Sequence, residues 1–347
     1  MNNTASAISS ITTGPRQTNM ELLRILAMFL ILTVHADYWA LGLPTASECI
    51  QNPASSLTRM FIESIAILSV NVFVLISGWF SIKPSVKGFG NFIFQCAFFF
   101  IGIYAVMILA GLQTLSFQGI KVALLLTPKN WFVKAYIGLY ILAPVLNYYS
   151  ENAPRKQFRT LLICFFTFQT IYGCTGAAAF IASGYSTFSF IGLYLLARYL
   201  KIYKPGICKL GGVLLCLSIA VNTAAEFFLT YNSIEFFVHW GIFNYINPLV
   251  ILGATGLLLM FSSMKVPHSR FINWIAASSF AVFLVHCNPN IGTPYFKPLI
   301  QQLYSQFDGP LCILVIGIVL VLIFLGSVLL DQPRKWMWKY IVKIAHL

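Results

Sequence analysis

Long apolar stretches recur along almost the whole chain, and short polar segments separate them. A transmembrane helix needs about 20 mainly apolar residues. The candidate segments are residues 20–42, 60–82, 89–111, 131–149, 160–180, 186–203, 207–230, 243–264, 271–290 and 309–330. A Gly/Ser-rich stretch from Gly173 to Ser189 obscures the turn between the fifth and sixth segments. The pattern predicts an all-α, polytopic membrane bundle of about ten transmembrane helices.

Three regions follow from the same pattern. Residues 1–19 are polar and predict a disordered cytoplasmic tail without the features of a secretory signal. Residues 20–331 form a single membrane domain, because no polar gap is long enough for a separate soluble domain. Residues 332–347 are basic and aromatic, which is typical of anchoring at the cytoplasmic face of a membrane.

Composition excludes the soluble classes of protein. The 347 residues are 59% hydrophobic and 9% charged, whereas soluble domains run near 45–50% apolar and about 25% charged. The mean hydropathy is +0.81. A soluble core of this size cannot hide so much apolar surface, so the excess faces lipid.

The distribution of positive charge gives an orientation. The chain has 22 Lys and Arg against 9 Asp and Glu. With ten crossings and both termini in the cytoplasm, 17 of the 22 basic residues fall on the cytoplasmic side and five on the other. The positive-inside rule therefore explains the basic charge, and nucleic acid is not an expected partner.

The eight cysteines are scattered, mostly within apolar runs, and no CxxC motif or Cys/His cluster is visible in the sequence. We therefore expect small core residues, with neither a disulfide framework, nor a metal site, nor a bound cofactor.

The first apolar segment carries an ionisable pair, Arg24 and His35. Eleven residues are almost three helical turns, so both side chains project from one face, about 16 Å apart along the axis. Arginine binds phosphate through two parallel hydrogen bonds, and histidine exchanges protons near neutral pH. The spacing suits a long substrate with an anionic head at Arg24 and a reactive end at His35. The alternative is an orienting arginine and a histidine that hydrogen-bonds to another helix.

Arg, ten residues, then His in the first helix resembles the signature of the acyltransferase 3 family of integral-membrane acyltransferases. Three later segments are similar to the family's motifs in the expected order: SVNVFVLISGWF at 69–80, NWF with LYILAPVL at 130–146, and SSFAVFLVH at 278–286. The chain departs from many members by having ELLRI at 21–25 in place of DGLRG, a variant closer to the polysaccharide-modifying branch. Lys83 and Lys87 stand where many members have an Arg-rich segment.

The resemblance implies His35 and Arg24 as catalytic residues. Further candidates for substrate binding are Glu21, Asn71, Ser77, Lys83, Trp131 and His286. For Glu21, orientation of Arg24 is the favoured role; for Asn71 and Ser77, interhelical hydrogen bonds are the alternative; for His286, the alternative is packing or hydrogen bonding. Asp37 points away from the face of His35 and is expected on the outer side.

One further group lies around the seventh segment. Asn222 and Glu226 share a helix face, and Glu235, His239 and Trp240 follow them. A carboxylate beside aromatic residues can bind sugar, but we expect a solvated loop here.

The resemblance implies an inner-membrane O-acyltransferase that moves an acetyl or other short acyl group from acetyl-CoA or another acyl-CoA to a sugar hydroxyl. The acceptor would be a cell-surface or secreted glycan or a lipid-linked saccharide. His35 would act as general base or carry the acyl group transiently. A transporter or flippase for a polar or lipid-linked solute is the alternative, and a non-enzymatic partner of a glycan synthase is a third possibility.

Overall fold

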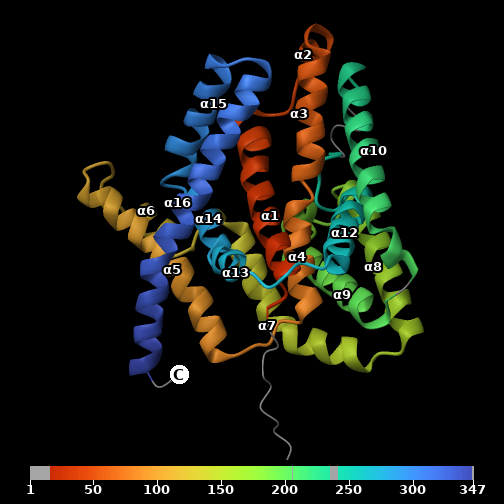
Figure 1. The fold of residues 1–347 in the computed structure, drawn as a ribbon, viewed down its shortest axis with the longest axis horizontal. Coiled ribbons are helices and arrows are strands. Elements are labelled where there is room, and N and C mark those ends of the chain that lie inside the picture. The colour runs from red at the N-terminus through yellow and green to blue at the C-terminus, as the bar shows by residue number, and fades with distance from the viewer. Residues whose placement is uncertain (1–15, 205, 235–240, 346–347) are drawn as a thin grey trace, which may run out of the picture.

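The computed structural model describes residues 16–204, 206–234 and 241–345, and every regular element in these ranges is a helix (Figure 1). The longer helices are α1 Thr18–Val34, α3 Pro53–Ala66, α4 Ser69–Phe80, α5 Val86–Leu109, α7 Trp131–Asn152, α8 Arg155–Cys174, α9 Thr187–Tyr203, α10 Gly211–Tyr231, α12 Pro248–Ser263 and α16 Gly309–Ile344. The shorter ones are α2 Ala46–Gln51, α6 Phe117–Ala123, α13 Arg270–Ala276, α14 Ser279–His286 and α15 Lys297–Gln306. Short π and 3-10 turns are η1 His35–Trp39, η2 Ala182–Gly184, η3 Gly206–Leu210 and η4 Gly292–Phe296.

Five helical stretches among the described residues are long and apolar enough to cross a membrane. They are Thr18–Trp39, Pro53–Phe80, Val86–Leu109, Gly211–Tyr231 and Gly309–Ile344. The other five predicted segments also coincide with helices, namely α7, α8, α9, α12 and the α13–α14 pair. The all-helical class is confirmed, whereas ten crossings remain a prediction.

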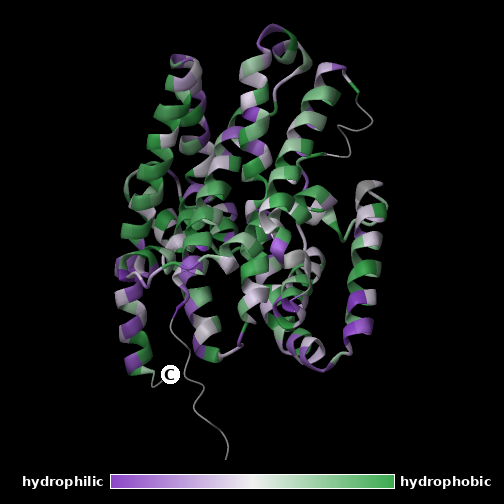
Figure 2. Cartoon of the chain, turned by 45° about the vertical axis from the view of Figure 1, so that its right-hand side comes forward, coloured by the Kyte–Doolittle hydropathy of each residue, from purple (hydrophilic) through white to green (hydrophobic). Residues whose placement is uncertain are grey.

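The helix α1 lies in the middle of the bundle (Figure 1), where it contacts α3, α4, α12, α13, α14 and α16. By contrast, α16 exposes a row of large apolar side chains. The row includes Leu314, Ile318, Leu322, Leu325 and Leu329. Figure 2 shows the hydrophobic colouring that runs over the outer helices. In a membrane protein, exposed apolar side chains of this kind face lipid. Most of the candidate polar residues lie in the interior of the bundle.

Glycines allow two helix pairs to approach closely. A Cβ at Gly256 in α12 would lie 2.6 Å from the carbonyl oxygen of Gly211 in α10, and a Cβ at Gly78 in α4 would collide with the backbone of Tyr194 in α9. Small residues at helix contacts are the usual means of packing in membranes, where lipid provides no hydrophobic drive between helices. The α4–α9 contact holds the segment that contains Ser77.

A buried ionic network joins α16 to α5. Arg334 donates two hydrogen bonds to Asp331, of 2.8 and 2.9 Å, and a third to Asn91 at 2.7 Å. Gln95 also donates to Asp331, at 3.1 Å. Both charged side chains are almost fully buried, so each depends on the other for its partner. The helix α16 continues through the predicted boundary at residue 331, and the first part of the predicted tail, at Arg334, belongs to the bundle.

The beginning of α1 and the end of α16 lie at the same end of the molecule (Figure 1). A chain that crosses a membrane an even number of times has both ends on the same side. Together with the positive-inside count, it leads to a topology prediction for the three accessible sites: the C-terminus, the α7–α8 turn around Ala153, and the 44–58 segment that contains α2.

We expect reporter fusions at Leu347 and in the 150–159 segment to give cytoplasmic signals, because these parts adjoin clusters of basic residues, which remain on the cytoplasmic side during insertion. A fusion in the 44–58 segment should report the opposite side. An outside signal at Leu347 would mean an odd number of spans and would contradict the ten-helix topology.

Candidate active site

Arg24 and His35 are both carried by the central helix. The backbone is α-helical from Thr18 through Val34, and His35 opens the π-helical turn η1. The two side chains therefore share one face, as the spacing predicts, and stand about 16 Å apart along the axis. π-helical turns inside helices are frequent at functional sites, and this one begins at the histidine itself.

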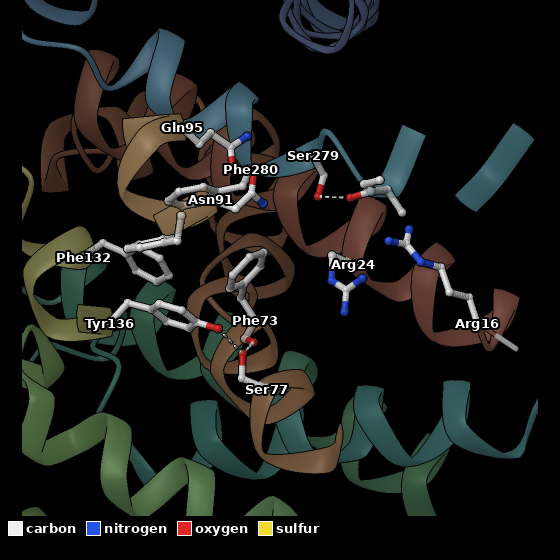
Figure 3. A pocket seen from close by; sticks show the side chains of 13 residues that line it. Arg16, Arg24, Phe73, Ser77, Asn91, Gln95, Phe132, Tyr136, Ser279 and Phe280 are labelled. Carbon is white, nitrogen blue, oxygen red and sulfur yellow. Dashed lines mark hydrogen bonds between the residues drawn. The ribbon is translucent and has the colours of Figure 1, made fainter. Parts of the chain in front are cut away.

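A cavity of about 310 Å³ opens beside Arg24 (Figure 3). Its polar lining combines Arg16 and Arg24 with Ser77, Tyr136 and other hydrogen-bonding groups; the full set is Arg16, Arg24, Phe73, Ser77, Asn91, Phe92, Gln95, Phe132, Tyr136, Ala276, Ala277, Ser279 and Phe280. The two guanidinium groups make this cavity suitable for an anionic group such as a phosphate.

Arg24 is held in place by Glu21, one turn earlier in α1. The guanidinium Nη1 donates to the Glu21 carboxylate, whose side chain is 7% exposed against 26% for Arg24. This is the orienting role expected for Glu21. The pairing uses one nitrogen of the guanidinium, so the rest of the planar group remains directed at the cavity.

At the other end of α1, His35 meets the end of α14. Its Nδ1 lies 2.9 Å from Nε2 of His286, and His286 Nδ1 lies 2.5 Å from the carbonyl oxygen of Val282. A carbonyl oxygen only accepts hydrogen bonds, so Nδ1 of His286 carries the proton. In the neutral ring, Nε2 of His286 then accepts, and Nδ1 of His35 donates. His35 is therefore left with an unprotonated Nε2, which is a base.

Cys287 completes this cluster. Its Sγ lies 3.4 Å from Nδ1 and 3.9 Å from Nε2 of His35. The ligand atoms of His35, His286 and Cys287 all lie within 4.8 Å of one another, so among the described residues this set has the spacing to hold a metal ion. Two nitrogens on a tetrahedral zinc ion would stand about 3.3 Å apart, so the 2.9 Å between the rings suits a shared proton better than a shared ion.

Aromatic side chains fill the space between the Arg24 cavity and the histidine pair. Phe132 and Phe280 line the cavity, and Phe283 packs against both, with ring centroids 5.3 and 5.8 Å away. On its other side, Phe283 meets the ring of His286 edge-on at 6.2 Å. This apolar partition separates the cationic cavity from the base.

Beyond η1, the far end of the bundle holds buried carboxylates. Asp37 pairs with Arg59 at 2.7 Å. Glu63 is fully buried, and neither of its oxygens has a hydrogen-bond partner within the described residues. Glu226 is 2% exposed, and both Glu63 and Glu226 interact electrostatically with Tyr38. A buried carboxyl group without a hydrogen-bond partner is costly.

The structure corrects one interpretation at this end. The solvated loop expected for Asn222 and Glu226 is wrong, because both are buried in α10. Asn222 accepts a hydrogen bond of 3.3 Å from Asn247, which precedes α12. The helix α10 packs against α2 and α3 as well as α12, and this packing buries both residues. Glu235, His239 and Trp240 lie outside the described residues.

The remaining candidates separate into two groups. Ser77 lines the cavity and shares a 3.2 Å hydrogen bond with the hydroxyl of Tyr136 (Figure 3). Asn71 instead donates to the backbone of Tyr245 at 2.9 Å, and Lys83 is exposed in the segment between α4 and α5, outside the cavity lining. Trp131 meets Tyr185 edge-on at 4.5 Å, away from the cavity.

Sequence reasoning missed Arg16, Glu63 and Cys287. The expectation of core cysteines holds for Cys49, Cys96 and Cys312; Cys164 and Cys216 are exposed, and Cys287 is partly exposed. The side chains of Cys174 and Cys208 lie outside the described part of the chain. The one available signal for Cys287 was its position directly after His286.

Comparison with known proteins identifies the family of the chain. The model of the acyltransferase 3 family, described as an acyltransferase domain, matches residues 17–331. No curated protein and no solved structure matches the chain. The family match spans all the helices that form the site, from α1 to most of α16, and the chain thus belongs to the acyltransferase 3 family of membrane acyltransferases.

Proposed function

We propose that the protein transfers an acetyl or other short acyl group from acyl-CoA to a sugar hydroxyl of a cell-surface or secreted glycan, or of a lipid-linked saccharide, at the inner membrane. The observation that carries the proposal is the free Nε2 of His35 at one end of α1, with the Arg24 cavity at the other end of the same face. A donor with phosphates at one end and a thioester at the other fits that separation.

On the donor side, Arg24 and Arg16 would hold the phosphates of CoA. Glu21 keeps the Arg24 guanidinium oriented, and the Ser77–Tyr136 pair offers neutral hydrogen-bonding groups deeper in the cavity. The aromatic partition of Phe132, Phe280 and Phe283 provides an apolar passage for the arm that bears the acyl group, and it keeps bulk water from the thioester.

At the reacting centre, His35 would act as general base. Its Nε2 takes the proton of the attacking sugar hydroxyl as the oxygen bonds to the acyl carbon, and the same proton then passes to the departing sulfur of CoA. The fully buried His286 holds the ring of His35 in the required tautomer. His286 is therefore a positioning residue.

On the acceptor side, Glu63 and Glu226 would accept hydrogen bonds from saccharide hydroxyls. Both are buried at the far end of the bundle from Arg24, and Glu63 has no donor of its own among the described residues. A transporter or flippase could use the same carboxylates. Transfer by the purified protein in detergent distinguishes the two functions, because a transporter needs two compartments.

Replacing Arg24 by lysine tests the donor site. A point charge cannot reproduce the planar fork, and one lost hydrogen bond to a charged group is worth about 1.5–3 kcal/mol. We expect Arg24→Lys to reach the membrane in normal amount and to bind acetyl-CoA roughly 10- to 100-fold more weakly, measured by isothermal titration calorimetry in detergent. The matched control is Arg270→Lys, at an exposed position outside the cavity. Equal affinity in both variants would reduce Arg24 to an orienting charge.

Replacing His35 by alanine tests the base. An uncharged, apolar residue creates no burial penalty, and the lost interhelical hydrogen bond averages about 0.6 kcal/mol in membranes, so thermal stability in detergent should change little. Acyl incorporation into the acceptor should fall about 100- to 10,000-fold, as is typical when positioned proton transfer is lost.

The exposed His268 provides the control variant His268→Ala, which should keep both stability and transfer. A well-folded His35→Ala protein with near-normal incorporation would contradict the assignment of His35 as the base. An unfolded one would show that His35 is needed for the fold.

A further inference from the structure

Cys287 lies in contact with the proposed base. It follows the last residue of α14, and its Sγ is 3.4 and 3.9 Å from the two ring nitrogens of His35. Among the described cysteines it alone makes such a contact with a histidine. It is also partly exposed, whereas Cys49, Cys96 and Cys312 are buried. The residue as a whole is thus less enclosed than these three cysteines.

The tautomer of His35 makes the pair reactive. The hydrogen-bond chain through His286 leaves Nε2 of His35 unprotonated. Sγ of Cys287 lies nearer to the protonated Nδ1, at 3.4 Å, than to this bare nitrogen, at 3.9 Å, so the Cys287 side chain has to rotate toward Nε2 before that nitrogen takes the thiol proton. A cysteine beside a base that is itself oriented by a third group is the usual arrangement of an activated sulfur nucleophile. In this structure the third group is His286.

The turn after Cys287 keeps two unused hydrogen-bond donors. The Nδ2 groups of Asn288 and Asn290 are buried and have no partner among the described residues. The Oδ1 of Asn288 accepts from the backbone nitrogen of Asn290 at 3.0 Å, which fixes the Asn288 amide. Unpaired buried donors call for an acceptor, and the oxyanion of an acyl-transfer intermediate is such an acceptor.

From this juxtaposition we infer that Cys287 carries the acyl group as a covalent thioester between donor and acceptor. The inference rests on the proposed function and deepens it. It changes the order of events from direct transfer, with donor and acceptor bound together, to two successive transfers through one sulfur atom.

In the first transfer, Sγ of Cys287 attacks the acyl carbon of acyl-CoA, and the bond from that carbon to the CoA sulfur breaks. The proton moves from Cys287 to Nε2 of His35 and then to the departing CoA thiol. One thioester replaces another, so no oxidant, reductant or added energy is needed. In the second transfer, the sugar oxygen attacks the thioester, and its proton returns through His35 to Sγ of Cys287.

The test uses the purified full-length protein in detergent with acetyl-CoA labelled in the acetyl group, without acceptor. We expect up to one labelled acetyl group per chain, located at Cys287 by mass spectrometry and released by neutral hydroxylamine, which cleaves thioesters. Free labelled CoA should also exchange into acetyl-CoA without acceptor, because the first transfer is reversible.

Variants give the decisive comparison. Cys287→Ala should fold, lose the label and the exchange, and transfer at least 100-fold more slowly to an acceptor glycan. The control Cys312→Ala, at a buried cysteine of α16, should keep the label, the exchange and the normal rate of transfer. If Cys287→Ala does not fold, alkylation of the wild-type protein decides instead: prior incubation with acetyl-CoA should protect Cys287 from N-ethylmaleimide.

Two outcomes overturn the inference and differ in what else they remove. The thioester intermediate is ruled out if wild-type protein and Cys287→Ala transfer equally fast, or if acetyl-CoA does not protect Cys287. Either result leaves the proposed acyltransferase function intact. Wild-type protein that neither releases CoA from acetyl-CoA nor labels the glycan would remove the proposed function, and the thioester with it.

Discussion

The hydrogen-bond chain from the carbonyl of Val282 through His286 to His35 determines most of what this site can do. It connects the first helix to α14, 251 residues later, and it fixes on each ring which nitrogen carries the proton. Because His286 is 1% exposed, water cannot replace either partner. With one more proton on His35, or with its proton on Nε2 in place of Nδ1, Nε2 of His35 would no longer be a free base.

The rest of the bundle places that chain where chemistry is useful. The helix α1 is surrounded by six others, so it forms a rigid rod with Arg24 at one end and His35 at the other. Close packing of α4 on α9, which Gly78 permits, holds the cavity wall at Ser77. The aromatic partition then separates the cationic cavity at Arg24 from the histidine pair, and the buried Glu63 and Glu226 lie at the far end of the bundle.

The sequence pattern predicted the features that depend on residues close together in the chain, namely the positions of helices and the faces of their side chains. The long apolar stretches located the helices, and the eleven-residue spacing predicted the shared face of Arg24 and His35 because the α-helix runs from Thr18 to Val34, directly before His35. The neighbours of His35 could not be predicted in this way, since the contact with His286 and Cys287 depends on how α14 packs against α1. The same reason explains the error at Glu226, whose burial depends on how α10 packs against other helices. The resemblance identified His286 as a candidate, but its contact with His35 is visible only in the folded structure.

The proposed chemistry depends most on the protonation pattern of the histidine pair. Nitrogen-15 NMR of the protein with labelled histidine distinguishes protonated from bare ring nitrogens, and His35→Ala and His286→Ala assign the signals. We expect His35 and His286 both to be neutral, each with its proton on Nδ1 and with Nε2 bare, and we expect His35 to lose this fixed tautomer in His286→Ala. A proton on Nε2 of His35 in the wild-type protein would contradict this expectation.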